Sequence, residues 1–483
     1  MLRDSVAVIS SSHAAAVCAV LLHLVLRAVI EPPLMGIWTT MRRVLEYAGY
    51  SSLGINRAAA RDIAVAAGRR DGQSQRQVAD VAMTAEVVSA AFVALVLLGA
   101  GTLQFYRGSV QWAVALWVAA WIAVAGRYQA FCLTVLRSEK QFSVLARARV
   151  FGAIADMLLL GGGAYCLASH DTTAPFYGMM GGAAVAHLLN ACYVRIAGRL
   201  RFAAECDRGL ASRLLVDGWP MAAEALALAA LRSIDQLAIV GFLPDGAQQL
   251  GWYSIAVVLS AWAFDQSNLL ANVVYPRLGE TLGRTGNPAA VLRLGLRSAE
   301  LIALAMVPCA ALLLAAGVPA VHWLLPKYRP GLGAVGGLVA AAALMGISMP
   351  LRYALITVGR AVWMLLATAL AAGASLAGSV WLLNRGGGLN GVSWNSAAAA
   401  AICLSLLILL CLAACGDLWP LAVRVAGAAV YGLLGTAKFT YLQDATWPQW
   451  ALLVAWCLGP IGLLARRIEW KQSLPGRPAV GSS

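Results

Sequence analysis

Two apolar runs joined by a very short turn dominate the middle of the chain. The stretch from Asp217 to Leu278 reads DGWPMAAEALALAALRSIDQLAIVGFLPDGAQQLGWYSIAVVLSAWAFDQSNLLANVVYPRL, with the turn at Pro244 to Gln249. A helix of about 20 apolar residues spans the hydrocarbon core of a bilayer, so each half is long enough to cross a membrane. The stretch therefore predicts a transmembrane helical hairpin.

The composition of the whole chain is that of a polytopic membrane protein. Of its 483 residues, 61% are hydrophobic and only 12% are charged. A soluble fold of this length could not bury so much apolar surface. The formal net charge is +14, but the basic residues lie in short segments between apolar runs, as the positive-inside rule predicts. Because no basic-aromatic platform or zinc finger accompanies this charge, we do not expect a nucleic-acid partner.

Cysteines and histidines give no sign of a metal site or a disulfide framework. None of the ten cysteines belongs to a CxxC pair, and most lie in or at the ends of apolar runs, where a thiol acts as a small hydrophobe. His23 and His187 fall inside candidate spans, where a single histidine is usually a packed, hydrogen-bonded residue. The chain also lacks a GxxxxGKS/T phosphate loop. We therefore expect no metal, no cofactor and no direct ATP hydrolysis.

Hydropathy predicts an all-α polytopic membrane protein with about fourteen spans. Arginines and lysines gather on alternate connections when both termini are placed in the cytoplasm, which supports this count. No connection is long enough for a folded domain, and the longest are treated as polar loops, at 57–80 and 195–213. The predicted spans are 6–30, 34–55, 81–103, 112–136, 150–168, 176–194, 214–242, 250–275, 294–317, 332–358, 361–383, 389–415, 418–441 and 450–464.

An internal repeat predicts the domain organisation. The second span opens with MGIWT at Met35 to Thr39, and the eighth opens with LGWYS at Leu250 to Ser254, each after a helix and a proline-containing turn. Two duplicated six-helix bundles are a common plan for transporters. We therefore predict an N-terminal lobe at 1–205, a C-terminal lobe at 206–415, an appended helix pair at 416–466 and a cytoplasmic tail at 467–483.

The motifs around both pentapeptides resemble a known family. SIDQLAIVGFL, a short turn and LGWYSIA, followed by VVYPRL, resemble the pattern of the polysaccharide flippases of the multidrug/oligosaccharidyl-lipid/polysaccharide exporter superfamily, the O-antigen-type lipid-linked oligosaccharide flippases. LRAVIEPPLMGIWTTMRRVLEYAGYSSLGINRAAARDI is similar to the family's first helix and to its second, which starts with glycine and an aromatic residue. LLPKYRPGL is similar to the turn before the tenth helix.

The resemblance implies a transporter and not an enzyme. Such a flippase moves an undecaprenyl-diphosphate-linked glycan from the inner to the outer leaflet by alternating access, and relatives have a cationic central cavity for the diphosphate and sugar. The implied location is the bacterial inner membrane, and the implied role is the biosynthesis of a surface polysaccharide such as lipopolysaccharide or exopolysaccharide. Expected partners are the lipid-linked glycan, membrane lipids and other polysaccharide assembly proteins, and we expect a monomer.

Charged residues inside the predicted spans are the candidate site residues. A charge at the bilayer centre costs at least about 2.5–3.5 kcal/mol, so it normally faces a protein interior or a water-filled path. Arg42 and Arg43 lie in the second span, and guanidinium groups can bind phosphate oxygens bidentately. Either arginine could instead pair locally with Glu46. Because three charges cannot pair evenly, the segment keeps a net positive charge.

Acidic residues of the second and seventh spans are candidates for ion coupling. Glu224, Arg232 and Asp235 share one helix face. Arg232 and Asp235 are expected to form an ion pair, and Glu224 could couple transport to protons or sodium. We assign ion coupling to Glu224, Asp235 and Glu46, and include Arg232 among the substrate-binding residues.

The remaining candidates for substrate binding come from several spans. Asp265, Asn268 and Asn272 form a polar stripe that suits sugar hydroxyls, although hydrogen bonding between helices would explain it equally well. The set is completed by Arg27, Arg127, Arg352 and Lys438.

Two other functions compete with the flippase. A cation-coupled exporter of drugs or small molecules with the same fold would have a cavity rich in carboxylates and aromatic residues, whereas arginines outnumber carboxylates inside these spans. A membrane-embedded glycan polymerase or ligase is disfavoured, because such enzymes place their chemistry on large external loops. The sequence does not identify the glycan.

Overall fold

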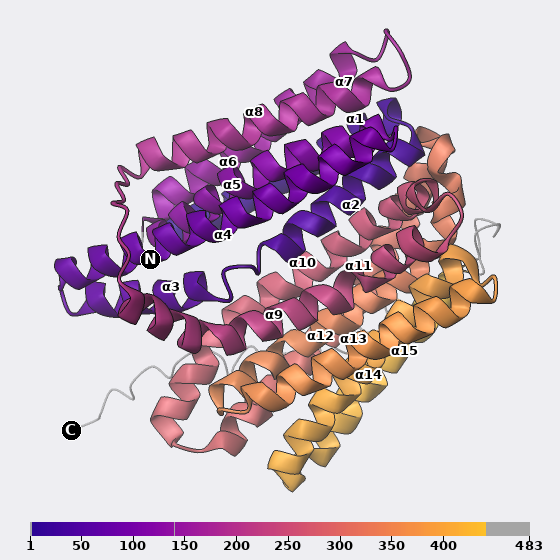
Figure 1. Ribbon diagram of the computed structural model, residues 1–483. Coiled ribbons are helices and arrows are strands. Elements are labelled where there is room, and N and C mark those ends of the chain that lie inside the picture. Colours follow the sequence, from indigo (N-terminus) through magenta and orange to yellow (C-terminus); the bar gives the residue numbers. More distant parts are fainter. Residues whose placement is uncertain (1, 140, 441–483) are drawn as a thin grey trace, which may run out of the picture. The chain divides into compact units, whose positions relative to one another are not determined.

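The computed structural model describes residues 2–139 and 141–440, which are almost entirely helical (Figure 1). No strand occurs within these residues, which confirms the all-α prediction. The predicted span at 450–464 and the tail at 467–483 lie outside the described residues. The helices of the first half are α1 (Leu2–Val29), α2 (Pro32–Ala48), α3 (Ile55–Gly68), α4 (Gly72–Tyr106), α5 (Val110–Ser138), α6 (Phe142–Asp156), the π-helical turn η1 (Met157–Gly161), α7 (Gly162–Cys166) and α8 (Ala174–Ala197).

The second half continues the all-helical pattern. Its elements are α9 (Arg208–Phe242), α10 (Gly246–Thr285), α11 (Pro288–Leu324), the 3-10 segment η2 (Pro326–Ala334), α12 (Val335–Thr357), α13 (Ala361–Asn384), α14 (Gly388–Ala414), η3 (Gly416–Leu418) and α15 (Trp419–Thr440). The hairpin predicted around Pro244 to Gln249 is confirmed, since α9 ends at Phe242 and α10 begins at Gly246.

Nine helices in the described part of the chain are long and apolar enough to cross a membrane. They are α1, α4, α5, α9, α11, α12 together with η2, α13, α14 and α15. The chain is therefore a multi-pass membrane protein. The other predicted spans within the described residues correspond to α2, α6 with α7, α8 and α10, which are shorter or less apolar, so the count of about fourteen stays a prediction.

The structure corrects the prediction of one span over 34–55 followed by a polar loop. Helix α2 already ends at Ala48, and the chain turns through Leu53 and Gly54, whose φ angles are 49° and 89°. The arginine-rich segment then forms α3, because alanine and arginine favour helix and the apolar residues recur at helical spacing. Arginines in the segment had suggested a loop, but they lie on the outer face of an amphipathic helix.

Helix α3 is held against the start of α9 by paired charges. Arg61 Nη2 donates to Asp217 at 2.6 Å, and Arg213 Nη2 donates to Asp62 at 3.0 Å. The hydrogen bonds to Asp217 and Asp62 raise the pKa of Arg61 above its ordinary value. Ile63 of α3 packs in the same buried cluster as Phe131 of α5. These contacts join segments that are far apart in the sequence.

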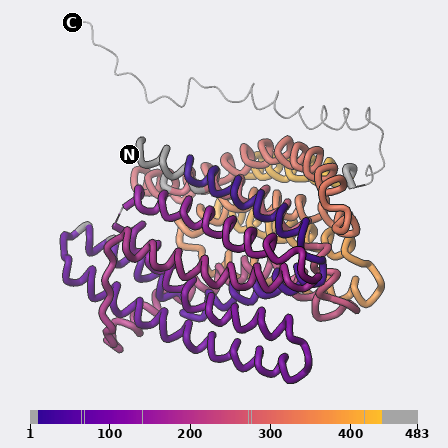
Figure 2. The backbone as a smooth tube through the Cα atoms, turned by 90° about the horizontal axis from the view of Figure 1, so that it is seen from above, coloured from indigo at the N-terminus to yellow at the C-terminus, as the bar shows by residue number. Residues whose placement is uncertain are grey.

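The chain divides into two compact units. Unit 1 holds the residues up to Ser254 together with Trp323–Pro330, and unit 2 holds Ile255–His322 and the residues from Gly331 onward. In unit 1, α4 packs on α5, α5 on α8, and α1 on α6, and Figure 2 shows these indigo to magenta helices running beside one another. The lobes at 1–205 and 206–415 were predicted from the internal repeat in the sequence and not from contacts. That division stays a prediction.

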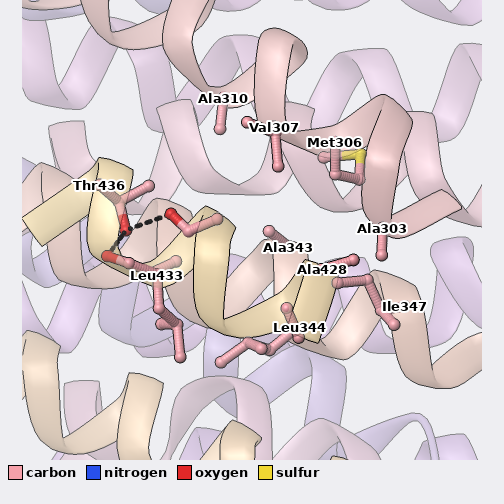
Figure 3. Close-up of a pocket in the computed structure, with 13 residues that line it drawn as sticks. Ala303, Met306, Val307, Ala310, Ala343, Leu344, Ile347, Ala428, Leu433 and Thr436 are labelled. Carbon is pink, nitrogen blue, oxygen red and sulfur yellow. Dashed lines mark hydrogen bonds between the residues drawn. The ribbon is translucent and has the colours of Figure 1, made fainter. Parts of the chain in front are cut away.

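In unit 2, α14 packs on α12 and α13, and α15 packs on α12. Figure 3 shows the narrow space between α11, α12 and α15, lined by small and aliphatic residues such as Ala303, Ala343 and Ala428. Its cavity volume of about 20 Å³ has room for roughly one water molecule. Helix α15 is therefore packed directly onto its neighbours.

The repeated pentapeptides meet at a close crossing of α2 and α10 in unit 1. A Cβ built on Gly36 would lie 1.7 Å from the carbonyl oxygen of Ala247, and one on Gly251 would lie 1.8 Å from that of Pro32. Ala247 is four residues before Gly251, and Pro32 is four residues before Gly36. Each glycine thus touches the equivalent backbone position of the other helix. This reciprocity supports the predicted internal duplication.

Replacing Gly36 by Ala is expected to lower the stability of the protein by about 1–3 kcal/mol, because the new methyl group would overpack the backbone of α10. Thermal unfolding of the purified full-length protein in detergent measures the change.

Gly99→Ala on α4 is the matched control, since a Cβ at Gly99 meets nothing within 4 Å. Alanine favours a helix over glycine by about 1 kcal/mol, so this control should be neutral or slightly stabilising. A Gly36→Ala protein as stable as the wild type would show that α2 and α10 are not tightly packed.

Candidate functional site

Polar residues of α2 and α9 meet inside unit 1. Arg43 Nε donates a hydrogen bond of 2.8 Å to Gln236 Oε1, and the Arg43 guanidinium also pairs with Glu46. One turn further along, Tyr47 and Ser233 share a hydrogen bond of 2.9 Å between their hydroxyl groups. Side-chain hydrogen bonds therefore link α2 and α9, the two helices in which the sequence predicted intramembrane charges.

Asp235, beside Gln236 on α9, is a buried acceptor. Its carboxylate accepts from the Tyr253 hydroxyl at 2.5 Å and from the backbone N–H of Gln236 at 2.8 Å. The predicted ion pair between Arg232 and Asp235 stays a prediction. Glu224 and Arg232 lie half-buried on the same helix.

Arg27 on α1 makes several contacts within unit 1, although its buried Nε has no hydrogen-bond partner among the described residues. Its Nη2 donates to the backbone oxygen of Ser254 at 3.2 Å and to the Ser254 hydroxyl at 3.0 Å. Its Nη1 lies 3.3 Å from His23 Nδ1, and the guanidinium faces the ring of Tyr328 at 6.0 Å. Arg27 therefore ties α1 to the first turns of α10.

Arg42 differs from Arg27 and Arg43. Its side chain is exposed, and its guanidinium makes no hydrogen bond or ion pair with any residue that the structure describes. Its charge acts on Asp156, His23 and His187. Since Arg43 is matched by Glu46, Arg42 provides the surplus positive charge that the sequence predicted for this segment.

A polar cluster formed by Asp156 on α6 and His187 and Asn190 on α8 lies in unit 1, and the charge of Arg42 acts on Asp156 and His187. Asp156 Oδ1, His187 Nδ1 and Asn190 Oδ1 are buried, and none has a hydrogen-bond partner within the described ranges. Gly152 brings α6 close to Asn190, because a Cβ there would lie 3.4 Å from Asn190 Oδ1. The π-helical turn η1 starts directly after Asp156, and such turns are frequent at functional sites.

The sequence prediction missed this polar cluster. His187 was interpreted as a packed residue, and neither Asp156 nor Asn190 was considered. In the sequence, the only sign of these residues' role was the carboxylate of Asp156 next to a glycine-rich apolar run. The residues belong to different helices, and only packing brings Asp156 and His187 within reach of the charge of Arg42.

A buried ion pair joins α4 and α5 in unit 1. The Arg127 guanidinium pairs with Glu86, with Nε donating to Glu86 Oε2 at 2.8 Å. Arg127 Nη1 donates to the backbone oxygen of Ala48 at 2.7 Å and to the Ser51 hydroxyl at 2.8 Å. Arg127 thus holds the end of α2, where the chain breaks before α3. Glu86, which neutralises Arg127, was missed in the sequence.

The candidates beyond Ser254 lie in unit 2. Asp265 is exposed, and Asn268 Oδ1 accepts from the Tyr353 hydroxyl at 3.5 Å. Arg352 is only 2% exposed, and its Nη1 donates to the Thr368 hydroxyl at 3.0 Å. The side chains of Asn272 and Lys438 lie outside the described residues. The substrate-binding roles assigned to these five residues stay predictions.

Comparison with solved structures establishes the fold. An inward-facing multidrug resistance transporter of the MATE family of the MOP superfamily matches with a TM-score of 0.61 and 15% identity, covering 88% of this chain and 96% of that chain. Its outward-facing counterpart matches with a TM-score of 0.61 and 13% identity, covering 92% and 97%. The lipid II flippase MurJ, in an inward closed conformation, matches with a TM-score of 0.63 and 11% identity, covering 96% and 99%.

The all-helical architecture and these similarities define the class: the chain has the MOP-superfamily fold of membrane transporters and flippases. Residues 63–328, more than half of the chain, match the family model described as polysaccharide biosynthesis protein, so the chain belongs to that family. No curated protein matches the chain. The family resemblance found in the sequence is confirmed by this match, and the solved structures show that the fold is the same.

Replacing Arg127 by Ala is expected to destabilise the protein by about 3–5 kcal/mol, because it leaves the Glu86 carboxylate buried without its counter-charge. Equilibrium unfolding of the purified protein measures this loss.

Arg107→Ala is the matched control, since Arg107 is exposed where α4 ends. Its effect should stay within about 0.5 kcal/mol. Equal stability of the two variants would mean that the buried pair contributes nothing.

Proposed function

We propose that this protein flips a polyprenyl-diphosphate-linked oligosaccharide from the inner to the outer leaflet of the bacterial inner membrane, for the biosynthesis of a surface polysaccharide. The observation that carries the proposal is Arg42, an exposed guanidinium with no hydrogen bond or ion pair among the described residues. A diphosphate supplies the negative charge and the paired oxygens that a guanidinium binds bidentately.

The neighbours of Arg42 are consistent with a transient anionic ligand. A permanent carboxylate partner would neutralise Arg42, as Glu46 does for Arg43. Asp156 instead interacts with Arg42 only through its charge, without a hydrogen bond in the part of the chain that the structure describes. A substrate phosphate can therefore bind Arg42 without first breaking an ion pair.

The comparisons support a flippase of lipid-linked glycans. The family is described by its role in polysaccharide biosynthesis, and a solved structure with the same fold is a lipid II flippase. The transporters of the MATE family share the fold equally well, so a cation-coupled exporter is the alternative that the experiments must exclude. The surplus arginine favours an anionic substrate over a cationic drug.

Asp156 joins the predicted residues as a carboxylate for ion coupling. Asp235 already accepts two hydrogen bonds, and Glu46 is paired with Arg43. Asp156 Oδ1 is buried and has no such partner within the described residues. A diphosphate bound to Arg42 offsets the positive charge that stabilises the ionised carboxylate of Asp156. Uptake of a proton or a cation by Asp156 then becomes more favourable.

Replacing both Arg42 and Arg43 by Ala should abolish export of the glycan without lowering the amount of protein in the membrane. Lysine at both positions should retain part of the activity, because the charge remains while the bidentate geometry is lost. Accumulation of undecaprenyl-linked glycan on the cytoplasmic leaflet of cells that carry each variant is the measurement. Arg107→Ala is the control. Full export by the double alanine variant, or no accumulation in cells without the protein, would reject the proposal.

Asp156→Asn should remove the response of transport to an imposed pH or sodium gradient, because the amide cannot exchange a proton or a cation. Transport by the purified protein in vesicles, with and without the gradient, measures this response. Glu224→Gln is the comparison, since Glu224 is the residue that the sequence favoured. If Glu224→Gln loses the response and Asp156→Asn keeps it, coupling occurs on α9.

A further inference from the structure

A pocket with several polar residues in a largely apolar wall lies in unit 1. It has a volume of about 270 Å³ and is bounded by the end of α2, the start of α3, and the facing sides of α4 and α5. Its polar residues are Glu46, Asn56, Glu86 and Arg127, and alanine and glycine make up much of the remaining wall.

Glu86 provides an incomplete hydrogen-bonding site in this wall. The residue is only 2% exposed, and its Oε2 accepts from Arg127. Its other oxygen, Oε1, is buried and has no hydrogen-bond partner in residues 2–139 or 141–440. A buried carboxylate oxygen is stabilised by a donor. A hydrogen-bond donor on a ligand in this pocket would supply the missing partner.

The charges of the wall favour a neutral donor over a cation. Glu86 is paired with Arg127, and Glu46 is paired with Arg43. Because each carboxylate already has a positive partner, a further cation would gain little, whereas a hydroxyl or amide N–H can donate without adding charge. The amide of Asn56 can both donate and accept. Such a set of groups suits a polyhydroxy ligand.

The size and position of the pocket narrow the ligand further. A volume of 270 Å³ is far more than a single ion or water molecule needs, and it leaves room for a sugar ring. Glu46 lies four residues after Arg42 on α2, so the two residues lie about 6 Å apart along the helix axis and on the same side of the helix. A sugar linked directly to a diphosphate has its two parts at a comparable spacing.

We propose that the pocket lined by Glu46, Asn56, Glu86 and Arg127 binds the sugar residue next to the diphosphate while Arg42 binds the diphosphate. This inference rests on the proposed function. Arg42 would then bind the diphosphate of any polyprenyl diphosphate through its charge. The pocket would select the glycan by binding its hydroxyl groups.

The test compares two lipids on the full-length protein in nanodiscs: undecaprenyl diphosphate, and the same lipid carrying one hexose. The wild type should bind the sugar-bearing lipid about tenfold more tightly. Ala90→Leu fills the pocket from α4 and should remove this preference while leaving the affinity for undecaprenyl diphosphate unchanged. Ala91→Leu is the matched control, because Ala91 is the next residue on α4 and is exposed.

A second filling variant, Ala123→Leu on α5, covers the case in which Ala90→Leu does not fold. The pocket assignment is wrong if the wild type binds both lipids equally, or if both filling variants keep the preference. It is also wrong if methylammonium, and not free hexose, competes with the sugar-bearing lipid, since the pocket would then bind a cation. Failure of undecaprenyl diphosphate to bind the wild type would instead reject the proposed function and the pocket with it.

Discussion

The cost of placing charge inside an apolar membrane determines how this protein is built. An intramembrane arginine is stabilised by an acceptor within the protein, and the structure shows such acceptors for three of them. Arg27 binds Ser254, Arg43 binds Gln236 and Glu46, and Arg127 binds Glu86. The same contacts hold α1, α2 and α5 against distant segments of the chain. The side chains that stabilise the arginine charges therefore also define the packing of unit 1.

Arg42 matters because it departs from this pattern. It lies one residue before Arg43 on the same helix, yet it is exposed and makes no hydrogen bond among the described residues. Helical geometry separates the two guanidinium groups by about 100°, which turns one toward α9 and the other toward Asp156. Adjacent identical residues therefore have different tasks: Arg43 connects helices, and Arg42 remains available to a ligand.

The glycine crossing of α2 and α10 places these arginines. Gly36 and Gly251 let the two helices touch backbone to backbone, each at the equivalent position of the other. A side chain at either position would push α2 away and change which groups Arg42 and Arg43 face. The duplicated pentapeptides could be recognised in the sequence, but their direct contact could not, because a glycine at such a spacing serves turns, hinges and close packing equally well.

The sequence alone determined the class of protein, the α9–α10 hairpin and the second helix as a source of surplus positive charge. These features depend on the local length of apolar runs and on the energetic cost of each charge in them. The helix α3, the polar cluster around Asp156 and the pocket beside Glu86 were decided only by tertiary structure. The partners of an arginine can lie far along the chain: Glu86 neutralises Arg127, and Gln236 accepts a hydrogen bond from Arg43. Such partners are brought together by packing, which local sequence patterns do not specify.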